Sequence, residues 1–318
     1  MLCVSFHIDR LKAALTKMPE GGTGFILPDH NALAASLYKG NPAALPLEER
    51  MIVFAYLNEA VYARARENGH FVDQLYIHPI AGNISFEAVC EPLYRQEIDL
   101  LLSISHSVDY SDTLKNNIAL LTETLFDELI AIDGFRNDFL LWDGLPIDQK
   151  RLSALSFLYV FAQAADKLFP WKTRPTDFYY VEEGLTHTDM AAFCPDFMTS
   201  EKPPEHYIAG NEKNLNEMTN NQFFYMLHHE AIHNLIYQMT LSYYTGDCDD
   251  DSYRADAQLK QCLMRNRYSA TGDIQSLYFA NCEEQICYAN QDRAWEKMRQ
   301  LSPSRQLPYF PAPLTGPL

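Results

Sequence analysis

One five-residue segment restricts the fold of this chain more than any other: His229-Glu230-Ala231-Ile232-His233, which has the pattern H-E-x-x-H. Two histidines four residues apart lie on one face of an α-helix, one turn above each other. Their imidazoles can therefore bind one zinc ion, and the glutamate beside the first histidine can act on a water molecule at the metal. The alternative interpretation is a helix that carries these residues by coincidence on a partly exposed face.

The residues around this segment predict where its helix begins and ends. Thr219 to Gln222 has the capping-box form T-x-x-Q, which is typical of a helix N-terminus. The two histidines then lie in the middle of a helix that we predict at 220–239, where the backbone is most rigid. His228 points about 100° away from His229 and is expected on the helix surface or beside the ligands. An apolar surface at helical spacing supports the helix: Phe223, Phe224, Leu227, Ala231, Leu235 and Ile236.

Length, charge and cysteine content restrict the class of protein. At 318 residues the chain can bury a sizeable core and suits two domains. A net charge of −17 argues against a nucleic-acid partner and against an anionic membrane surface. No apolar run reaches the length of about 18 residues that a membrane span needs. The sequence therefore favours neither a nucleic-acid partner nor a membrane span.

The cysteines and the N-terminus bear on the compartment. Seven cysteines with irregular spacing and no C-x-x-C pair indicate reduced thiols rather than a disulfide framework. Asp9 and Arg10 interrupt the apolar stretch that a Sec-type signal would need. We therefore expect a cytosol-like reducing compartment, or export into a host cell by a non-classical route.

The first half of the chain is predicted to be helical. Pro170 closes the last of these helices because its ring cannot continue one. Successive helices of this length predict a helical domain at residues 1–170, which could recognise a substrate or a partner. Periodic apolar residues place the helices at four segments: 48–67, 91–105, 111–132 and 149–169.

The pattern changes after Pro170. Three short segments have the composition of strands: the aromatic run at 177–181 and the segments 190–194 and 206–209. Further helices are predicted at 254–265 and 273–298. The strands thus come immediately before the H-E-x-x-H helix, and another long helix follows it.

A catalytic zinc usually takes three protein ligands and keeps a fourth position for water. The residues after His233 lack the metzincin extension H-E-x-x-H-x-x-G-x-x-H, so the third ligand comes from elsewhere. Glu284 and Glu283 lie in the middle of the late predicted helix. We favour Glu284, which shares a helix face with the small residues Ala280 and Cys287. Glu283 is the alternative, and a solvent-facing pair of glutamates is the third interpretation.

Over about residues 175–300, the order of strands, H-E-x-x-H helix and glutamate helix resembles the gluzincin branch of the zincin metallopeptidases. The segment from Glu283 to Tyr288 is similar to the E-x-x-A form of their glutamate helix, with Cys287 where a small alanine is usual. The resemblance implies an α+β fold, mainly α, with a zincin-like catalytic domain at 171–318. That domain would contain a small, mostly antiparallel sheet, to which a substrate strand would add at 206–209.

The resemblance also implies a chemistry. Zn²⁺ would be held by His229, His233 and Glu284, and peptide bonds of a protein substrate would be hydrolysed. Glu230 would take a proton from the attacking water as general base and pass it to the leaving amine. A further donor would stabilise the oxyanion. Its candidates are Tyr268, Tyr288 and His228.

Other functional hypotheses remain open. By analogy alone, a protease with an unfamiliar helical half is compatible with a bacterial effector or toxin that acts in a host cytosol. A second hypothesis is a non-catalytic helical interaction protein whose zinc site is structural or vestigial, closed by a fourth side chain such as Cys287. A third is a zinc hydrolase that acts on a non-peptide amide.

Overall fold

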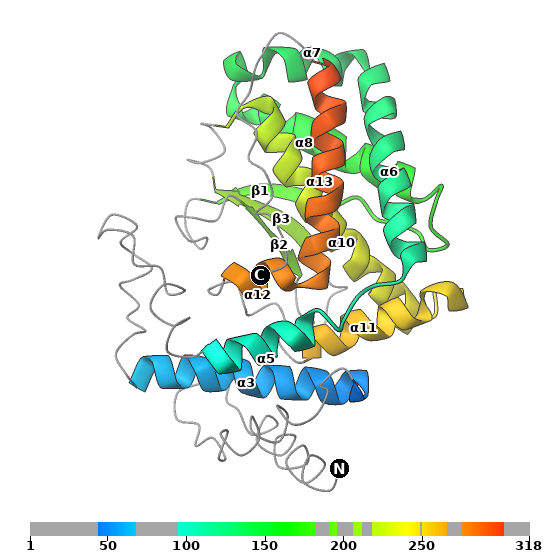
Figure 1. Ribbon diagram of the computed structural model, residues 1–318. Coiled ribbons are helices and arrows are strands. Elements are labelled where there is room, and N and C mark those ends of the chain that lie inside the picture. The colour runs from blue at the N-terminus through cyan, green and yellow to red at the C-terminus, as the bar shows by residue number, and fades with distance from the viewer. Residues whose placement is uncertain are drawn as a thin grey trace, which may run out of the picture. The chain divides into compact units, whose positions relative to one another are not determined.

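The part of the chain that the computed structural model describes is mostly helical, with one small sheet (Figure 1). Within it, no helix combines the length and the apolar character needed to cross a bilayer. The described residues are 44–67, 95–181, 191–195, 206–211, 218–248, 250–265 and 275–301.

The chain divides into two compact units, each assembled from two stretches of sequence. The described residues of the first unit lie within Met1–Asp109 and Gln261–Glu284. Those of the second lie within Tyr110–Lys260 and Gln285–Leu318. This division differs from the predicted boundary between domains at 1–170 and 171–318, because helices from the first half pack with the sheet and the H-E-x-x-H helix.

The first unit is a small helical assembly. Its helix α3 (Leu47–Glu67) packs on α5 (Arg95–Ser105), which also contacts α12 (Gln275–Ala280). The Arg50 guanidinium donates to the backbone carbonyl of Ser107 at 2.6 Å and to its hydroxyl at 2.9 Å. The N-terminal turn of α3 is thereby joined to the segment that follows α5. The predicted helix at 48–67 is confirmed, while the start of the one predicted at 91–105 lies outside the described residues.

In the second unit, the other helices pack around the central helix α10 (Asn220–Thr245). The helix predicted at 111–132 ends as expected, because Ile132 has an extended backbone, and a new helix begins directly after it. Phe135 and Phe139 of that helix are buried one turn apart, which explains why the chain stays helical there. The helices are α6 (Asp112–Ala131), α7 (Asp133–Leu141), α8 (Ile147–Ala165), α10 (Asn220–Thr245) and most of α13 (Cys282–Leu301).

The sheet has three strands in the order β1-β3-β2, close to the three predicted segments: β1 (Asp177–Val181), β2 (Ala191–Pro195) and β3 (His206–Asn211). The central strand β3 runs parallel to β1 and antiparallel to β2. The sheet is therefore mixed, and the expectation of a mostly antiparallel one is wrong. Sheet and helices meet where β1 packs against α8 and β2 against α10 (Figure 1).

The central place of β3 also changes the predicted docking of a substrate strand. Both edges of β3 are already paired, with Tyr179 opposite Ala209 on one side and Phe193 opposite Ile208 on the other. A further strand can pair only with an edge that has unpaired backbone groups. Addition at 206–209 is therefore wrong for this sheet, and β1 or β2 is the edge that a peptide could extend.

The helix α10 begins with the predicted capping box. The side-chain oxygen of Thr219 accepts the backbone N–H of Gln222, and the Gln222 side chain accepts the backbone N–H of Thr219. The helix ends at Gly246, whose φ of 81° is left-handed and suits glycine. It therefore extends beyond the predicted end near Met239, because no terminating residue comes earlier.

Most faces of α10 are covered, which makes it a core helix rather than a surface helix. Aromatic rings from the preceding helices surround its first turns. The ring of Phe223 lies 4.5 Å from that of Trp142, and the ring of Phe224 lies 5.0 Å from that of Phe135. Each of the apolar residues predicted to support this helix is buried: Phe223, Phe224, Leu227, Ala231, Leu235 and Ile236.

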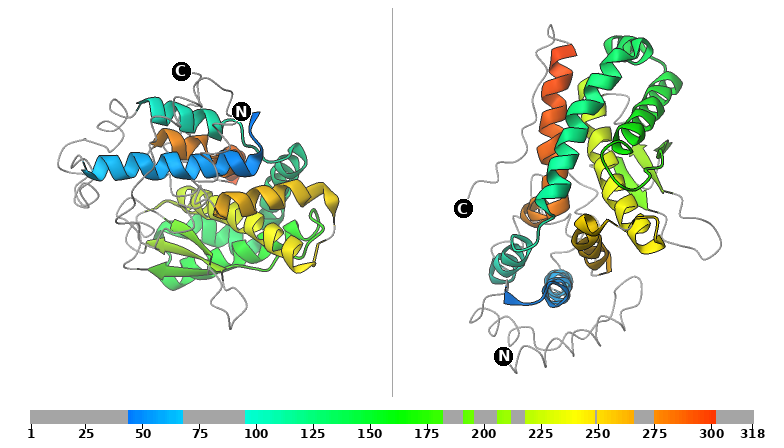
Figure 2. Two further views of the ribbon diagram at one scale, coloured as in Figure 1. Left: turned by 90° about the horizontal axis from the view of Figure 1, so that it is seen from below. Right: turned by 90° about the vertical axis from the view of Figure 1, so that its right-hand side faces the viewer.

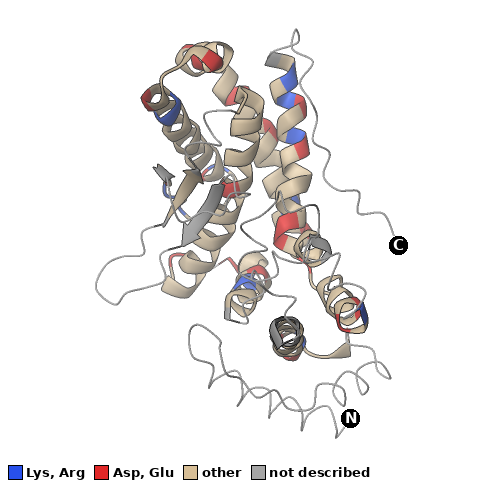
Figure 3. Ribbon diagram, turned by 90° about the vertical axis from the view of Figure 1, so that its left-hand side faces the viewer, with Lys and Arg blue, Asp and Glu red and all other residues tan. Residues whose placement is uncertain are grey.

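The second half of α13 lies beside α6 (Figure 2, right). Figure 3 shows basic positions along this part of α13, and two of them pair with acidic residues of α6. Arg293 lies 3.3 Å from Glu123, and Lys297 lies 3.0 Å from Asp127. Exposed ion pairs of this kind contribute about 0–1 kcal/mol each, so they align the two helices more than they stabilise the fold.

The N-terminus of α6 is held by a buried carboxylate. Asp256, in helix α11 (Arg254–Arg265), accepts the backbone N–H of Ser111 at 2.7 Å and the Ser111 hydroxyl at 2.6 Å. The same hydroxyl accepts the backbone N–H of Leu114 at 3.1 Å and thus caps α6. One carboxylate therefore fixes the capping residue in place.

We expect Asp256→Ala to lower the free energy of unfolding by about 2–3 kcal/mol, because charge-assisted hydrogen bonds in a buried site are lost together with the orientation of a cap. Urea unfolding followed by circular dichroism measures this change. Asp251→Ala is the matched control: this exposed carboxylate pairs with Arg254 on the surface, and its removal should change stability by less than about 0.5 kcal/mol. Equal effects of the two substitutions would contradict the role assigned to Asp256.

Candidate metal centre

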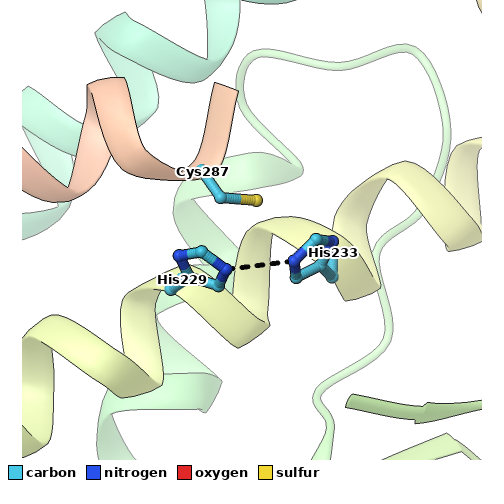
Figure 4. Close-up of side chains that lie close together, drawn as sticks. All are labelled: His229, His233 and Cys287. Atoms are coloured by element: carbon cyan, nitrogen blue, oxygen red, sulfur yellow. Dashed lines mark hydrogen bonds between the residues drawn. The ribbon is translucent and has the colours of Figure 1, made fainter. Parts of the chain in front are cut away.

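Two adjacent turns of α10 bring the imidazoles of His229 and His233 together, as the sequence predicts (Figure 4). Their Nε2 atoms lie 3.1 Å apart and their ring centroids 4.9 Å apart. In a tetrahedral zinc site with bonds of about 2.0–2.1 Å, two ligand nitrogens are about 3.3 Å apart. The two nitrogens are thus placed as a pair of ligands to one ion requires.

A third donor comes from α13. The ligand atoms of His229, His233 and Cys287 all lie within 4.8 Å of one another. Figure 4 shows the Cys287 side chain directed toward the two imidazoles. Cys287 is fully buried and His229 nearly so, whereas His233 is partly exposed. Two imidazoles and a thiolate are donors that suit zinc and other borderline or soft ions, and do not suit magnesium or calcium.

A second side chain of α13 fixes the ring of His229. The Oε1 atom of Gln291 lies 3.1 Å from His229 Nδ1. A carboxamide oxygen only accepts hydrogen bonds, so Nδ1 carries the proton and Nε2 keeps its lone pair. This is the tautomer that metal binding through Nε2 requires, and such outer contacts orient histidine ligands in metal sites. Gln291 lies one turn after Cys287, on the same face of α13.

The structure describes the predicted general base Glu230 and two of the three candidate oxyanion donors. Glu230 is partly exposed on α10. Tyr288 has its ring centroid 4.9 Å from that of His229, so this candidate oxyanion donor lies beside the cluster. Tyr268, another candidate, lies outside the described residues. The third candidate, His228, faces a different part of the molecule.

His228 is a core residue, which corrects its expected place on the helix surface or beside the ligands. Its Nε2 lies 3.1 Å from the hydroxyl of Thr122 on α6. Burial, with a smaller electrostatic contribution from His229, lowers the pKa of His228 to about 3, so the ring is neutral at neutral pH. Three aromatic rings enclose it: Phe126, Phe157 and Phe161.

Glu283 and Glu284 occupy a different position from the one predicted. The predicted helix at 273–298 is broken at Asn281, whose side-chain oxygen accepts the backbone N–H of Glu283 at 2.9 Å and so caps α13. Both glutamates therefore lie in the first turn of α13 rather than in mid-helix, and both are buried. Among the described residues, neither belongs to the group of ligand atoms formed by the two histidines and Cys287. A role for Glu284 or Glu283 as third ligand stays a prediction.

Cys287 is the candidate ligand that the sequence pattern did not favour, because the pattern pointed to the carboxylate of Glu284 one turn earlier on the same face of α13. Comparison of the chain with protein-family models, with curated proteins and with solved structures gives no match. The resemblance to gluzincins therefore rests on the H-E-x-x-H segment and on the order of elements alone.

Metal content should separate the two adjacent histidines. We expect His229→Ala to lose the bound zinc, because it removes one ligand directly. His228→Leu should keep one zinc ion per chain, because that ring faces the aromatic core and Thr122 keeps a partner in the carbonyl of Ile118. Elemental analysis of the purified proteins measures the zinc content. Loss of zinc in both variants, with the fold preserved, would show that the face of α10 was assigned wrongly.

The contact of Gln291 with His229 should set the strength of metal binding. Gln291→Leu removes the acceptor at Nδ1, and we expect zinc affinity to fall about 10–100-fold while the stoichiometry at saturation stays the same. Competition with a chromogenic chelator measures the affinity. Gln291→Glu is the control, because a carboxylate accepts the same hydrogen bond and should keep the affinity near that of the unaltered chain. Unchanged affinity in Gln291→Leu would exclude this orienting role.

Proposed function

We propose that the chain is a zinc-dependent metallopeptidase that hydrolyses peptide bonds of a protein or peptide substrate. The observation that carries this proposal is the pair of Nε2 atoms of His229 and His233, 3.1 Å apart in an H-E-x-x-H segment. The tautomer of His229 is defined by its buried contact with Gln291, and Glu230 follows this first ligand in the sequence. This combination matches what a metal-assisted hydrolysis needs.

Each residue of the site has a separate role in the proposed reaction. His229 and His233 hold the ion together with a third protein ligand. When bound, zinc would lower the pKa of a water molecule to about 7 and polarise the scissile carbonyl. Glu230 takes a proton from the attacking water as general base and passes it to the leaving amine nitrogen. The hydroxyl of Tyr288 is the donor that we assign to the carbonyl oxygen as negative charge develops on it.

The exposure of these residues supports an open site. His229 and Cys287 are buried and form the inner side of the cluster, whereas Glu230 and His233 are partly exposed. A substrate carbonyl would therefore approach from the side of Glu230 and His233. The sheet edge that packs against α10 is β2, so we assign the extended substrate segment to β2.

A second candidate function is a non-catalytic interaction protein with a structural zinc site. Full burial of Cys287 favours it, because structural sites are enclosed and rich in thiolates. The two candidates differ in the fourth position of the ion. A catalytic site leaves that position to water, and a structural site fills it with a fourth side chain.

Replacement of the general base tests the proposal. We expect Glu230→Gln to keep zinc and fold but to reduce cleavage by at least about 100-fold, because the amide cannot accept the proton. Cleavage is measured by mass spectrometry on a proteome-derived peptide library with the zinc-loaded protein. His228→Leu serves as a control for substitutions in α10 and should cleave normally. Cleavage at the unaltered rate by Glu230→Gln would exclude Glu230 as the base, and no cleavage by the unaltered zinc-loaded chain would exclude a peptidase.

A further inference from the structure

We propose that Cys287 is the third protein ligand of the metal, so that the centre is a two-histidine, one-thiolate site. This inference rests on the proposed zinc function and specifies its ligand set. The sequence pattern favours a carboxylate at this position, as in gluzincins. The geometry of α10 and α13 points to the thiol instead.

The first argument is the alignment of the two helices. Each helix contributes two side chains one turn apart: His229 and His233 from α10, and Cys287 and Gln291 from α13. The hydrogen bond of 3.1 Å between Gln291 and His229 fixes which turns of α13 lie opposite the histidines. The residue one turn before Gln291 on that face is Cys287, which places its sulfur beside both imidazoles (Figure 4).

The second argument is bond geometry. Zinc–nitrogen bonds of about 2.0–2.1 Å and a zinc–sulfur bond of about 2.3 Å place tetrahedral nitrogen and sulfur ligands about 3.6 Å apart. The three ligand atoms lie within 4.8 Å of one another, and the two nitrogens are 3.1 Å apart. Small adjustments of side-chain torsions therefore suffice to bring all three atoms onto one ion.

The third argument is the position of the competing carboxylates. Glu284 and Glu283 lie in the first turn of α13, three and four residues before Cys287. Their spacing places them on the same side of the helix as Cys287, one turn closer to its N-terminus. The group of ligand atoms within 4.8 Å contains the thiol and, among the described residues, neither carboxylate.

A thiolate ligand has chemical consequences that can be measured. Sulfur must lose its proton to bind, so metal uptake releases a proton and becomes stronger as pH rises. Thiolate selects zinc, cobalt or cadmium over magnesium and calcium. Two imidazoles and one thiolate leave the fourth position to water, so this ligand set is compatible with hydrolysis.

Cobalt substitution of the full chain tests the proposal. The protein is stripped of metal with a chelator and titrated with Co²⁺ alone. A cobalt–thiolate bond gives a strong charge-transfer absorption in the near ultraviolet, which nitrogen and oxygen ligands do not give. We expect this band to saturate at one Co²⁺ per chain. Cys287→Ser should abolish the band and weaken Co²⁺ binding more than about 100-fold, beyond the effect of losing an outer contact.

Two further variants are controls for the loss of the absorption band. Cys282→Ser removes another buried cysteine of α13 that is not in the cluster, and the band should persist. Cys287→Asp should bind Co²⁺ through its carboxylate without the band, which shows that loss of the band does not reflect loss of the fold. Circular dichroism confirms folding of each variant.

The outcomes separate this inference from the proposed function. Binding of one Co²⁺ by the unaltered chain without the band would overturn Cys287 as ligand and leave the metallopeptidase proposal standing. Loss of Co²⁺ binding in Glu284→Gln, with binding kept in Cys287→Ser, would also overturn it in favour of the carboxylate. If the unaltered chain binds no Co²⁺ or Zn²⁺, both proposals fail.

Discussion

The packing of α10 into an aromatic core determines where the candidate metal centre lies. The first turns of the helix are enclosed by rings such as Trp142, which contacts both Phe223 and Phe224. Loss of one such buried ring costs about 3–5 kcal/mol, so α10 cannot rotate or shift without large loss of stability. Because this helix is fixed, the opposite face presents His229 and His233 at a constant position. The site is thus built on a rigid element and not on a loop.

The contrast between His228 and His229 shows how strongly one helical step changes the chemistry of a residue. The two residues are adjacent, but their side chains diverge by about 100°. His228 enters the aromatic core, bonds to Thr122 and is held neutral by burial. His229 faces α13, where Gln291 sets its tautomer. The environment of each ring, and not the residue type, decides which histidine can bind a metal.

Local signals explain what the sequence could predict. The capping box at Thr219 and the aromatic strand at 177–181 depend on neighbouring residues, and both are found as expected. The break at Asn281 was missed although Asn281 and Glu284 have the N-x-x-E spacing of a helix N-terminus, because the helical pattern continues on both sides of it. The central place of β3 and the grouping of α6 to α8 with the sheet depend on long-range packing, which periodicity does not encode. The proposed third ligand falls in this second class: periodicity placed Cys287 and Glu284 on one face of α13, but the turn of α13 that lies opposite His229 is given by the contact of Gln291.

The ligands that join His229 and His233 decide whether such a metal centre is catalytic or structural. With Cys287 as the proposed third donor, two of the three ligands, His229 and Cys287, would be buried, while His233 and the neighbouring Glu230 are partly exposed. A fourth protein ligand would take the place of the water molecule that hydrolysis needs. The same two helices can therefore support a hydrolase or a structural centre. The choice between them depends on whether a fourth side chain would bind the ion in addition to the proposed thiolate, and not on the fold as a whole.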